Sequence, residues 1–303
     1  MSGNSPYRIF DVTLAAKRLL SPHMMRLTFA GADVTDMATH APDQRIKLFF
    51  PRADGQLPSL PDSPDWYDIY RSVPPSERVP MRTYTIRHLR AARGEVDVDF
   101  VLHGETGPAS KWALNADIGD FIQICAPGRR FEGECGGYEW KPPADVGQVL
   151  LIADETALPA AAGIIEMMAS WPAPPATQAF LEVPERADRL DLPHFDGLDL
   201  HWLVRDAEGR QAGFGELMVQ AAGRARLPTT AAAGPADTAL ADVDIDQDVL
   251  WDRAEQTDSP FYGWVAGETG AVSQIRQFLI KDKAIDRRQL NLMGYWRQGR
   301  IRE

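Results

Sequence analysis

Apolar and polar residues alternate in short runs along the first half of the chain, and glycine or proline residues separate these runs. Alternation with a period of two is typical of β-strands, because successive side chains point to opposite faces of a sheet. Short strands with little helix between them predict an antiparallel barrel. Residues 107–116 are the one helix expected within it, and the six expected strands are residues 7–20, 23–31, 43–51, 81–87, 95–104 and 119–128.

The pattern changes near residue 142, after which continuous apolar runs alternate with helical segments. Continuous apolar runs are found in parallel strands that are buried on both faces. The alternation predicts a doubly wound α/β domain whose ligands bind at the carboxyl ends of its strands. We therefore expect a barrel domain at 1–143 and an α/β domain at 144–303. The α/β strands are expected at 149–155, 177–185, 198–206 and 261–268.

Residues 224–258 fit neither pattern, because they are rich in small and acidic residues. A calcium-binding loop would need a turn glycine where Gln247 stands and a terminal glutamate where Arg253 stands. The segment is therefore expected to be a solvated surface insertion. The residues that alternate like the start of such a loop are Asp242, Asp244, Asp246 and Asp248.

Composition and charge narrow the function classes. The chain has 303 residues and a formal net charge of −11, and such an acidic protein is not expected to bind nucleic acid. No apolar run approaches the roughly 20 residues that a membrane span needs. The N-terminus lacks the apolar stretch of a secretory signal, so a cytoplasmic location is expected. In that compartment Cys125 and Cys135 are expected to be free thiols.

Several chemistries are set aside. The six histidines show no zinc-ligand spacing, and no metal site is expected. No nucleophile elbow, P-loop or GxGxxG fingerprint is present, which disfavours hydrolases and kinases.

Three groups of residues remain as candidates for binding. The first is the strand MRTYTIR (81–87), which mixes guanidinium, phenol and hydroxyl groups where an ordinary half-buried strand would have one apolar face. The second is HGETGPAS (103–110), a glycine-rich loop before a helix, where backbone amides favour a phosphate. The third is DETALPA (154–160), directly after the first parallel strand. The second could also be a turn with Ser110 as helix cap, and the third a Thr156 cap with Pro159 in the first turn.

Together the three groups form a coherent device. An Arg-x-Tyr-Thr strand can stack its tyrosine on a flat ring, place a hydroxyl near a ring nitrogen and direct its guanidinium at a phosphate. A barrel followed by an α/β domain is the arrangement of flavin reductases of the ferredoxin-reductase type.

The sequence closely resembles the siderophore-interacting protein family, the flavin-dependent ferric-siderophore reductases. The resemblance covers nearly the whole chain and rests on five motifs in the same order. They are RTYTIR (82–87), DFVLHGETGPASKWA (99–113), ADETALPA (153–160), GWVAGE (263–268) and GYWRQG (294–299).

The resemblance implies a site for FAD on the first two motifs. It implies that the first motif lies at the isoalloxazine and ribityl-phosphate portion, and that His103, Ala109 and Ser110 hold the pyrophosphate and adenosine portion. The FAD residues so implied are Arg82, Thr83, Tyr84, Thr85, Asp99, Phe100, Val101, His103, Gly107, Ala109, Ser110 and Trp112, with Thr156 on the FAD or nicotinamide side.

The resemblance also implies a site for the electron donor, NADPH or NADH, on the third and fourth motifs. Arg205 or Arg210, near the end of a predicted strand, could receive a 2′-phosphate. The donor-site residues are Asp154, Glu155, Thr156, Ala157, Arg205, Gly267 and Glu268.

Family members collect basic side chains over the flavin to receive an anionic ferric siderophore. Lys47 and Arg297 are candidates here, as is Arg129 or Arg130. Members often carry GPRG after the last barrel strand, whereas this chain has APGRRF (126–131), so either arginine can fill the role. Each cation could equally be an ordinary solvated surface charge.

The reaction implied by the resemblance passes a hydride from NAD(P)H to FAD and single electrons to Fe(III) in a siderophore. The flavin carries this chemistry, so no catalytic side chain is predicted. Two alternatives stay open: a siderophore-binding protein that lacks turnover, and a general flavin reductase. A ferredoxin could replace NAD(P)H as donor, and a monomer is expected.

Overall fold

The structure is a computed structural model that describes residues 5–105, 107–207, 209–228, 249–255 and 259–299. The chain divides into two compact units, Met1–Tyr138 and Glu139–Arg302. None of the helices in the described residues has the length and apolar composition needed to cross a membrane.

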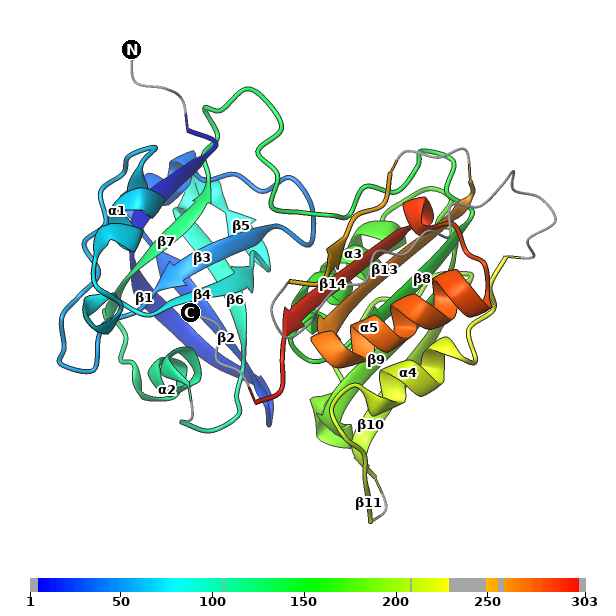
Figure 1. The fold of residues 1–303 in the computed structure, drawn as a ribbon. Helices are drawn as coiled ribbons and strands as arrows, with labels where there is room; N and C mark the ends of the chain where they lie inside the picture. Colours follow the sequence, from blue (N-terminus) through cyan, green and yellow to red (C-terminus); the bar gives the residue numbers. More distant parts are fainter. Residues whose placement is uncertain (1–4, 106, 208, 229–248, 256–258, 300–303) are drawn as a thin grey trace. The chain divides into compact units, whose positions relative to one another are not determined.

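The N-terminal unit is built on a curved antiparallel sheet in the strand order β4-β3-β7-β1-β2-β6-β5 (Figure 1). The rings of Tyr84 on β4 and Phe100 on β6 lie 4.2 Å apart between centroids, so the sheet curls until these strands face each other. The predicted barrel is confirmed as a half-barrel. Its strands are β1 (Tyr7–Ser21), β2 (Met24–Ala30), β3 (Arg45–Phe49), β4 (Met81–Thr85), β5 (His88–Arg90), β6 (Glu95–Val101) and β7 (Phe121–Pro127).

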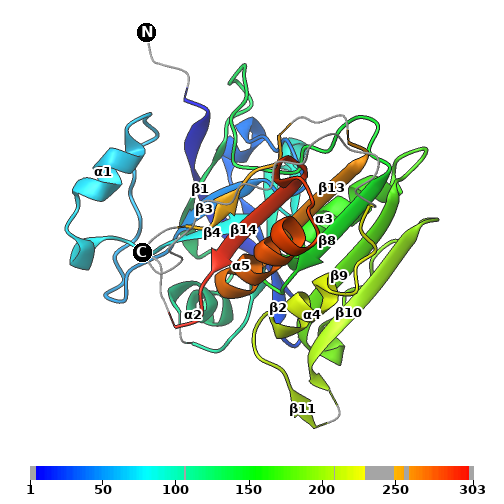
Figure 2. The ribbon, with the colours of Figure 1, turned by 45° about the vertical axis from the view of Figure 1, so that its right-hand side comes forward.

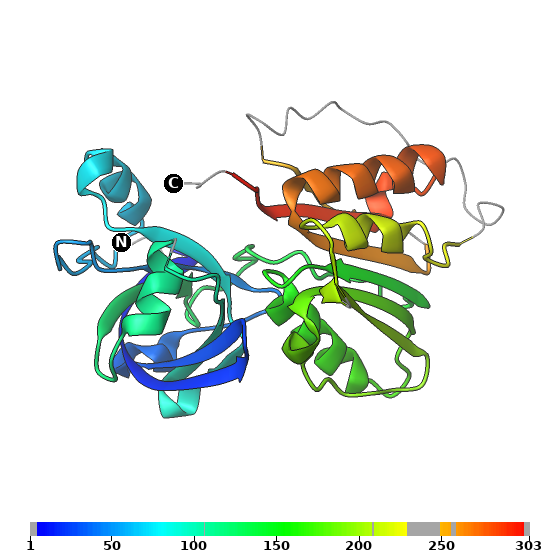
Figure 3. The same cartoon turned by 90° about the horizontal axis from the view of Figure 1, so that it is seen from below.

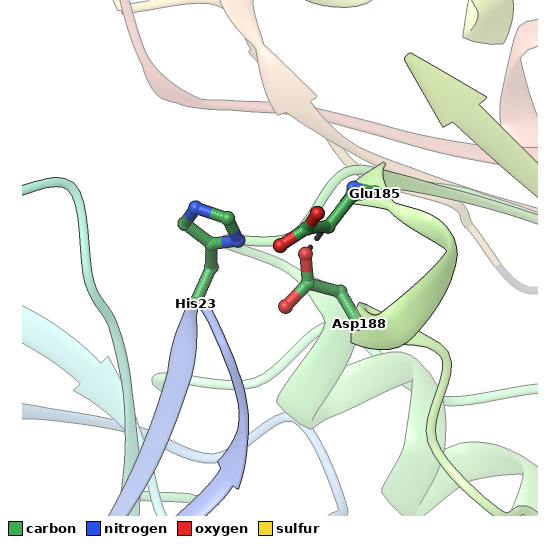
Figure 4. A group of neighbouring side chains, drawn as sticks. All are labelled: His23, Glu185 and Asp188. Carbon is green, nitrogen blue, oxygen red and sulfur yellow. Dashed lines mark hydrogen bonds between the residues drawn. The ribbon is translucent and has the colours of Figure 1, made fainter. Parts of the chain in front are cut away.

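The predicted hairpin is present, because β1 pairs with β2 in antiparallel register. His23 lies in the turn between them (Figure 4). The predicted helix is α2 (Pro108–Asn115). A second helix, α1 (Trp66–Ser72), lies between β3 and β4, where the sequence pattern predicts no helix. The short 3-10 turns of this unit are η1 (Ala32–Asp36), η2 (Pro75–Glu77) and η3 (Ala91–Arg93).

The inner face of the half-barrel holds a continuous apolar core. Alternate residues of β1, β3 and β6 supply it, including Phe10, Leu48 and Phe100, all fully buried. A second cluster lies on the opposite face of the sheet, where Tyr70 of α1 packs edge-on against Phe49 at 5.8 Å. Strands β1, β3 and β7 are therefore covered on both faces, which explains why their polar and apolar residues alternate imperfectly.

The C-terminal unit is a mixed sheet in the order β11-β10-β9-β8-β13-β14-β12. Its five central strands are parallel and the two edge strands antiparallel. Helices α4 and α5 cover one face and α3 the other (Figures 2 and 3). The strands are β8 (Gln148–Ala153), β9 (Ala176–Glu185), β10 (Leu198–Ala207), β11 (Arg210–Gln211), β12 (Trp251–Asp252), β13 (Phe261–Glu268) and β14 (Leu290–Trp296).

The helices of this unit follow the predicted alternation. They are α3 (Leu158–Ala169), α4 (Glu216–Ala222) and α5 (Thr269–Gln277), and α5 continues as a π-turn, η6 (Phe278–Asp282). The 3-10 turns are η4 (Arg186–Asp188) and η7 (Arg287–Gln289). A capping box closes η4, in which the backbone N–H of Glu185 donates to Asp188 at 3.2 Å (Figure 4).

Two features of the C-terminal unit differ from the sequence-based expectation. Strand β14 is a fifth parallel strand, and it ends in the GYW of the last motif. Residues 229–248 and 256–258 of the predicted insertion, with the four alternating aspartates, lie outside the described residues. Within the rest of that segment Leu250 is fully buried, and Trp251 stacks on Tyr295 at 5.8 Å. This stretch extends the sheet as β12 and is not a solvated loop.

Candidate functional site

Strand β4 presents the RTYT residues on two different faces. Its register with β3 sets Arg82 opposite Leu48 and Tyr84 opposite Ile46, on the side of the apolar core. Thr83, which is set opposite Lys47, points to the other side. In the predicted flavin strand, the side chains of Arg82 and Tyr84 therefore lie on one face and the hydroxyl of Thr83 lies on the other.

Tyr84 is held by packing. Its ring lies against Phe100, tilted by 32°. Burial raises the pKa of Tyr84 above its ordinary value, and the nearby Arg82 opposes this effect only in part. The phenol is therefore neutral near pH 7 and keeps its O–H as a donor.

Two side chains of β4 retain hydrogen-bonding capacity. The Arg82 guanidinium donates one hydrogen bond, from Nη1 to the carbonyl of Met81 at 2.7 Å, and makes no other to a described residue. Thr85 is buried, yet its hydroxyl bonds to no described residue.

The second motif is engaged in the unit's own structure. Arg26 holds the Asp99 carboxylate in two hydrogen bonds of 2.7 and 2.8 Å, and Arg87 lies 3.6 Å away. Phe100 is buried in the core, and the next residue, Val101, is half-buried at the end of β6. The Asp99 side chain is thus a counter-ion for Arg26, and its contact with FAD stays a prediction.

The loop before α2 is closed by Ser110. Its hydroxyl donates to the carbonyl of Gly104 at 2.6 Å and accepts from the backbone N–H of His103 at 3.3 Å. The helix is preceded by Gly107 as N-cap and makes no side-chain cap. Ser110 is therefore neither the helix cap nor a free hydroxyl, whereas the backbone amides of the first turn of α2 can still donate to a phosphate.

Two further residues of this motif pack against the apolar core of the half-barrel. The ring of Trp112 stacks on Phe29 at 5.9 Å, and Ala109 is buried in the same core. Both residues stabilise the packing of α2 against the half-barrel.

The basic candidates of the N-terminal unit differ in how far their charges are neutralised. Lys47 donates to Thr83 Oγ1 at 2.6 Å, and burial, aided by Arg45, lowers its pKa. Arg130 forms an ion pair of 2.9 Å with Asp36. The exposed side chain of Arg129 forms no ion pair with a described residue. Arg297, the fourth candidate, follows β14 in the other unit and is half-buried.

Asp154 organises the carboxyl edge of the second sheet. One oxygen accepts from the backbone and hydroxyl of Thr156 at 2.9 and 2.6 Å and from the backbone of Ala157 at 3.3 Å. The other accepts from the backbone of Glu268 at 2.8 Å and from Trp296 Nε1 at 2.7 Å. The third, fourth and fifth motifs therefore meet at this one carboxylate.

The Asp154 carboxylate also explains why a glycine stands at position 267. A Cβ on Gly267 would lie 2.6 Å from the Asp154 carboxylate oxygen, so no larger residue fits at that point of β13. Burial raises the pKa of Asp154 to about 7, and the neighbouring Glu155 acts in the same direction. The five donors oppose this shift, because each of them favours the ionised form.

Glu155 and Arg205 form a buried ion pair. Two hydrogen bonds of 2.6 Å join the carboxylate to the guanidinium, and a third, of 3.0 Å, joins Arg205 to Glu182. Glu182 also accepts from the backbone of Gly215, Leu217 and Met218 at the start of α4. Arg205 is therefore not the free cation expected for a 2′-phosphate. The side chain of Arg210 lies outside the described residues.

Aromatic rings cover this ion pair. The Arg205 guanidinium lies 4.6 Å from the ring centroid of Phe214, which in turn meets Trp296 edge-on at 5.1 Å. Phe214 is partly exposed, at 44%. Glu182, Phe214 and Trp296 were not predicted as site residues. A lone carboxylate inside the apolar run TQAFLEV was the available signal for Glu182.

Comparison with known proteins places this geometry in a family. Residues 13–131 match the siderophore-interacting FAD-binding domain, and residues 146–299 match the siderophore-interacting protein model. The chain belongs to the siderophore-interacting protein family. The family's FAD-binding domain corresponds to the half-barrel, so the N-terminal unit is an FAD-binding domain.

Relatives of this siderophore-interacting protein carry informative names. The ferric vibriobactin reductase of Vibrio cholerae is 29% identical over 95% of this chain and 89% of its own length. The NADPH-dependent ferric-chelate reductase of Escherichia coli is 26% identical over 71% of this chain and 78% of its own.

Solved structures agree with the fold. A siderophore utilization protein from T. fusca superposes with a TM-score of 0.72 at 25% identity, covering 99% of this chain and 97% of that one. The ferredoxin reductase in carbazole 1,9a-dioxygenase superposes with a TM-score of 0.61 at 14% identity, covering 96% and 70%. The fold is thus ferredoxin-reductase-like, as predicted.

The residues of β4 fit the FAD that the family domain binds. A planar ring system needs a flat apolar partner and hydroxyl donors, and a pyrophosphate needs a cation. The half-barrel supplies the guanidinium of Arg82, the ring of Tyr84 and the hydroxyl of Thr85 within one short strand.

Proposed function

We propose that this protein is an FAD-dependent ferric-siderophore reductase that uses a nicotinamide nucleotide as electron donor. The observation that carries the proposal is strand β4 of the family's FAD-binding domain. Its Arg82 and Thr85 keep hydrogen-bonding capacity that the described protein does not use. The names of the Vibrio cholerae and Escherichia coli relatives support the reaction class.

In this proposal FAD would accept a hydride and pass single electrons to Fe(III), so one nicotinamide nucleotide serves two iron centres. The chain supplies position and charge. Arg82 would hold a phosphate of FAD, Tyr84 would pack against the ring system, and Thr85 would bond to it. The first-turn amides of α2 would complete the phosphate contacts.

The iron chelate would be received by basic side chains. Oxygen ligands hold Fe(III) more tightly than Fe(II), so reduction would loosen the metal. Lys47 and Arg129 are proposed for the N-terminal unit, because Arg130 is already paired with Asp36. Arg297 is proposed for the C-terminal unit. Their positive charges would attract an anionic siderophore over a few ångströms, although the protein as a whole is acidic.

The donor would bind at the carboxyl edge of the second sheet, around Asp154, Glu155 and Thr156. This edge lies at β8 and β13, where the strand order reverses, and such switch points are where open α/β sheets bind ligands. We also propose a cytoplasmic monomer, since NAD(P)H is a cytoplasmic reductant and one chain carries both units. A ferredoxin is the alternative donor.

Anaerobic reduction tests the proposal. The purified protein is expected to carry FAD absorbance that is bleached by NADH or NADPH and restored by an anionic ferric siderophore, with Fe(II) appearing in a chelator trap. Recovery with free FAD but not with ferric siderophores would indicate a general flavin reductase. A colourless protein that binds ferric siderophores without turnover would indicate a binding protein.

A further inference from the structure

The carboxyl edge of the second sheet contains both side-chain types that distinguish NADH from NADPH. In dinucleotide-binding domains, an acidic residue after the second strand accepts from the ribose 2′-hydroxyl, or a nearby arginine accommodates the 2′-phosphate. Here Glu182 lies on β9, the second parallel strand, and Arg205 lies on β10. The two are hydrogen-bonded to each other at 3.0 Å.

The Arg205 guanidinium is occupied on several sides. Glu155 takes one N–H from each terminal nitrogen, both at 2.6 Å, and Glu182 takes a second N–H of Nη1. The face of the guanidinium is covered by the Phe214 ring at 4.6 Å. Arg205 is only 8% exposed. Of the two carboxylates, Glu155 is the one that a phosphate could displace, because Glu182 is also held by backbone amides at the start of α4.

The charge balance at this edge also opposes a phosphate. One guanidinium between two carboxylates leaves a formal charge of −1, and the buried carboxylates of Asp154 and Glu268 end the neighbouring strands β8 and β13. The described arginines that follow β9, Arg186 and Arg189, are exposed, where solvent and salt screen their charges.

The amides that commonly receive phosphates are taken as well. Asp154 accepts from the turn before α3, Glu182 from the start of α4, and Glu268 from Ala271 in the first turn of α5 at 2.9 Å. Helix starts attract anions, and here the chain's own carboxylates fill that role.

We propose that Glu155 is a specificity-determining residue, which holds Arg205 in its pair and thereby makes NADH, rather than NADPH, the donor. This inference rests on the proposed function, and it concerns only which nucleotide the donor site accepts. Glu155 acts through Arg205 and is a positioning residue. The effect belongs to nucleotide affinity, so it changes KM and leaves kcat nearly constant.

Calorimetric titration of the FAD-loaded protein with NAD⁺ and with NADP⁺ tests the inference without relying on turnover. Wild type is expected to bind NAD⁺ more tightly, by about tenfold, since like charges at a few ångströms cost that much in partly shielded surroundings. Glu155→Gln keeps the shape, frees one side of Arg205 and removes one negative charge. It is expected to bind NADP⁺ more tightly and to reduce the preference to about threefold or less.

Glu216→Gln is the matched control. Glu216 is an exposed residue at the start of α4, and its carboxylate accepts from the backbone N–H of Gly213 at 3.0 Å and from Gln220 at 3.1 Å. The substitution removes the same charge from the same part of the unit. It is expected to leave the NAD⁺ to NADP⁺ ratio at the wild-type value. If Glu155→Gln does not fold, Glu155→Asp, which draws the carboxylate back, is expected to move the ratio in the same direction.

Four results would overturn the inference. Wild type that binds NADP⁺ as tightly as NAD⁺ would show that no selection occurs. An unchanged ratio in Glu155→Gln, or an equal change in Glu216→Gln, would remove Glu155 as its cause. If neither nucleotide binds while dithionite bleaches the flavin and a ferric siderophore restores it, the nicotinamide donor is wrong and the selectivity falls with it, whereas the ferric-siderophore reduction stands.

Discussion

Strand β4 of the half-barrel and the carboxyl edge of the second sheet treat their polar groups in opposite ways. On β4 the Arg82 guanidinium makes one hydrogen bond, and the Thr85 hydroxyl makes none to a described residue. At the sheet edge Asp154 accepts five hydrogen bonds and Arg205 is bonded to two carboxylates. The first region keeps donors that a ligand with hydrogen-bond acceptors can use. In the second region the charged side chains already have partners within the protein.

Under the proposed function, this difference follows from what each ligand would do. A resident cofactor gains affinity when the protein keeps donors available and ordered for it. A donor that binds and leaves at each turnover needs a site whose structure persists in its absence. Pairing of Asp154, Glu155 and Glu182 with partners in the same unit provides that structure, because unpaired buried charges would destabilise the fold.

The largest expected effect concerns Arg205. Arg205→Ala would leave the buried carboxylates of Glu155 and Glu182 without their cation. Removing one partner of a buried ion pair typically costs about 3–5 kcal/mol. We expect the free energy of unfolding of the C-terminal unit to fall by that amount in urea denaturation. The exposed pair Arg226–Asp199 is the control, and Arg226→Ala should cost at most about 1 kcal/mol. Equal small losses would show that the edge is not held by its ion pairs.

The next effect concerns Arg82 and should appear in cofactor binding instead of stability. Arg82→Ala removes a charge-assisted contact with phosphate worth about 1.5–3 kcal/mol, so the Kd for FAD should rise about 10- to 150-fold. The unfolding free energy of the FAD-free half-barrel should stay within about 0.5 kcal/mol of wild type. A variant that retains FAD with wild-type affinity would mean that β4 is not the phosphate contact. A variant that loses stability without FAD would place Arg82 among the structural residues.

The third prediction concerns Asp97 of the half-barrel. Like the carboxylates at the edge of the second sheet, Asp97 is hydrogen-bonded to other side chains, those of Arg90 and Thr28. Burial alone would raise the pKa of Asp97, but hydrogen bonds from Arg90 and Thr28 outweigh it and lower the pKa to about 2. The stability that Asp97 contributes is therefore present above pH 4 and lost as the pH falls through 2. From the shift of its pKa below 3.8, the contribution is about 2 kcal/mol.

Acid titration of the unfolding free energy checks this contribution. Asp97→Asn should be less stable than wild type near neutral pH, and the two curves should converge between pH 4 and pH 2. Curves that stay parallel over this range would show that Asp97 keeps its ordinary pKa in the folded half-barrel.

The sequence was sufficient where a pattern is local. Alternation identified the strands around Tyr84, because it depends on neighbours in the chain. The ring-binding role of the Arg-x-Tyr-Thr spacing stays a prediction. It was insufficient for Arg205, whose partners Glu155 and Glu182 lie 50 and 23 residues away in sequence. Which of two charged residues is free is decided by such long-range pairing. The hydrogen bond from Ser110 to Gly104 could not be predicted either, because the glycine-rich sequence around it is typical of a phosphate-binding loop.

The smallest expected effect concerns two adjacent arginines, Arg129 and Arg130, of which only Arg130 has a carboxylate partner among the described residues. Arg129 is exposed and forms no ion pair with a described residue, while Arg130 lies 2.9 Å from Asp36, which Arg8 also contacts at 3.4 Å. An exposed charge acts on an anion at a few ångströms with about 1 kcal/mol. Arg129→Gln should therefore raise the KM for an anionic ferric siderophore about two- to fivefold, with unchanged FAD content. Arg130→Gln should raise this KM less, because Asp36 already offsets the charge of Arg130.

Salt near 0.5 M should raise the KM of wild type toward that of the Arg129 variant, since screening shortens the reach of the charge to roughly 4 Å. A larger effect of Arg130→Gln, or equal effects of both variants with a neutral acceptor, would contradict the assignment of Arg129 to the basic patch.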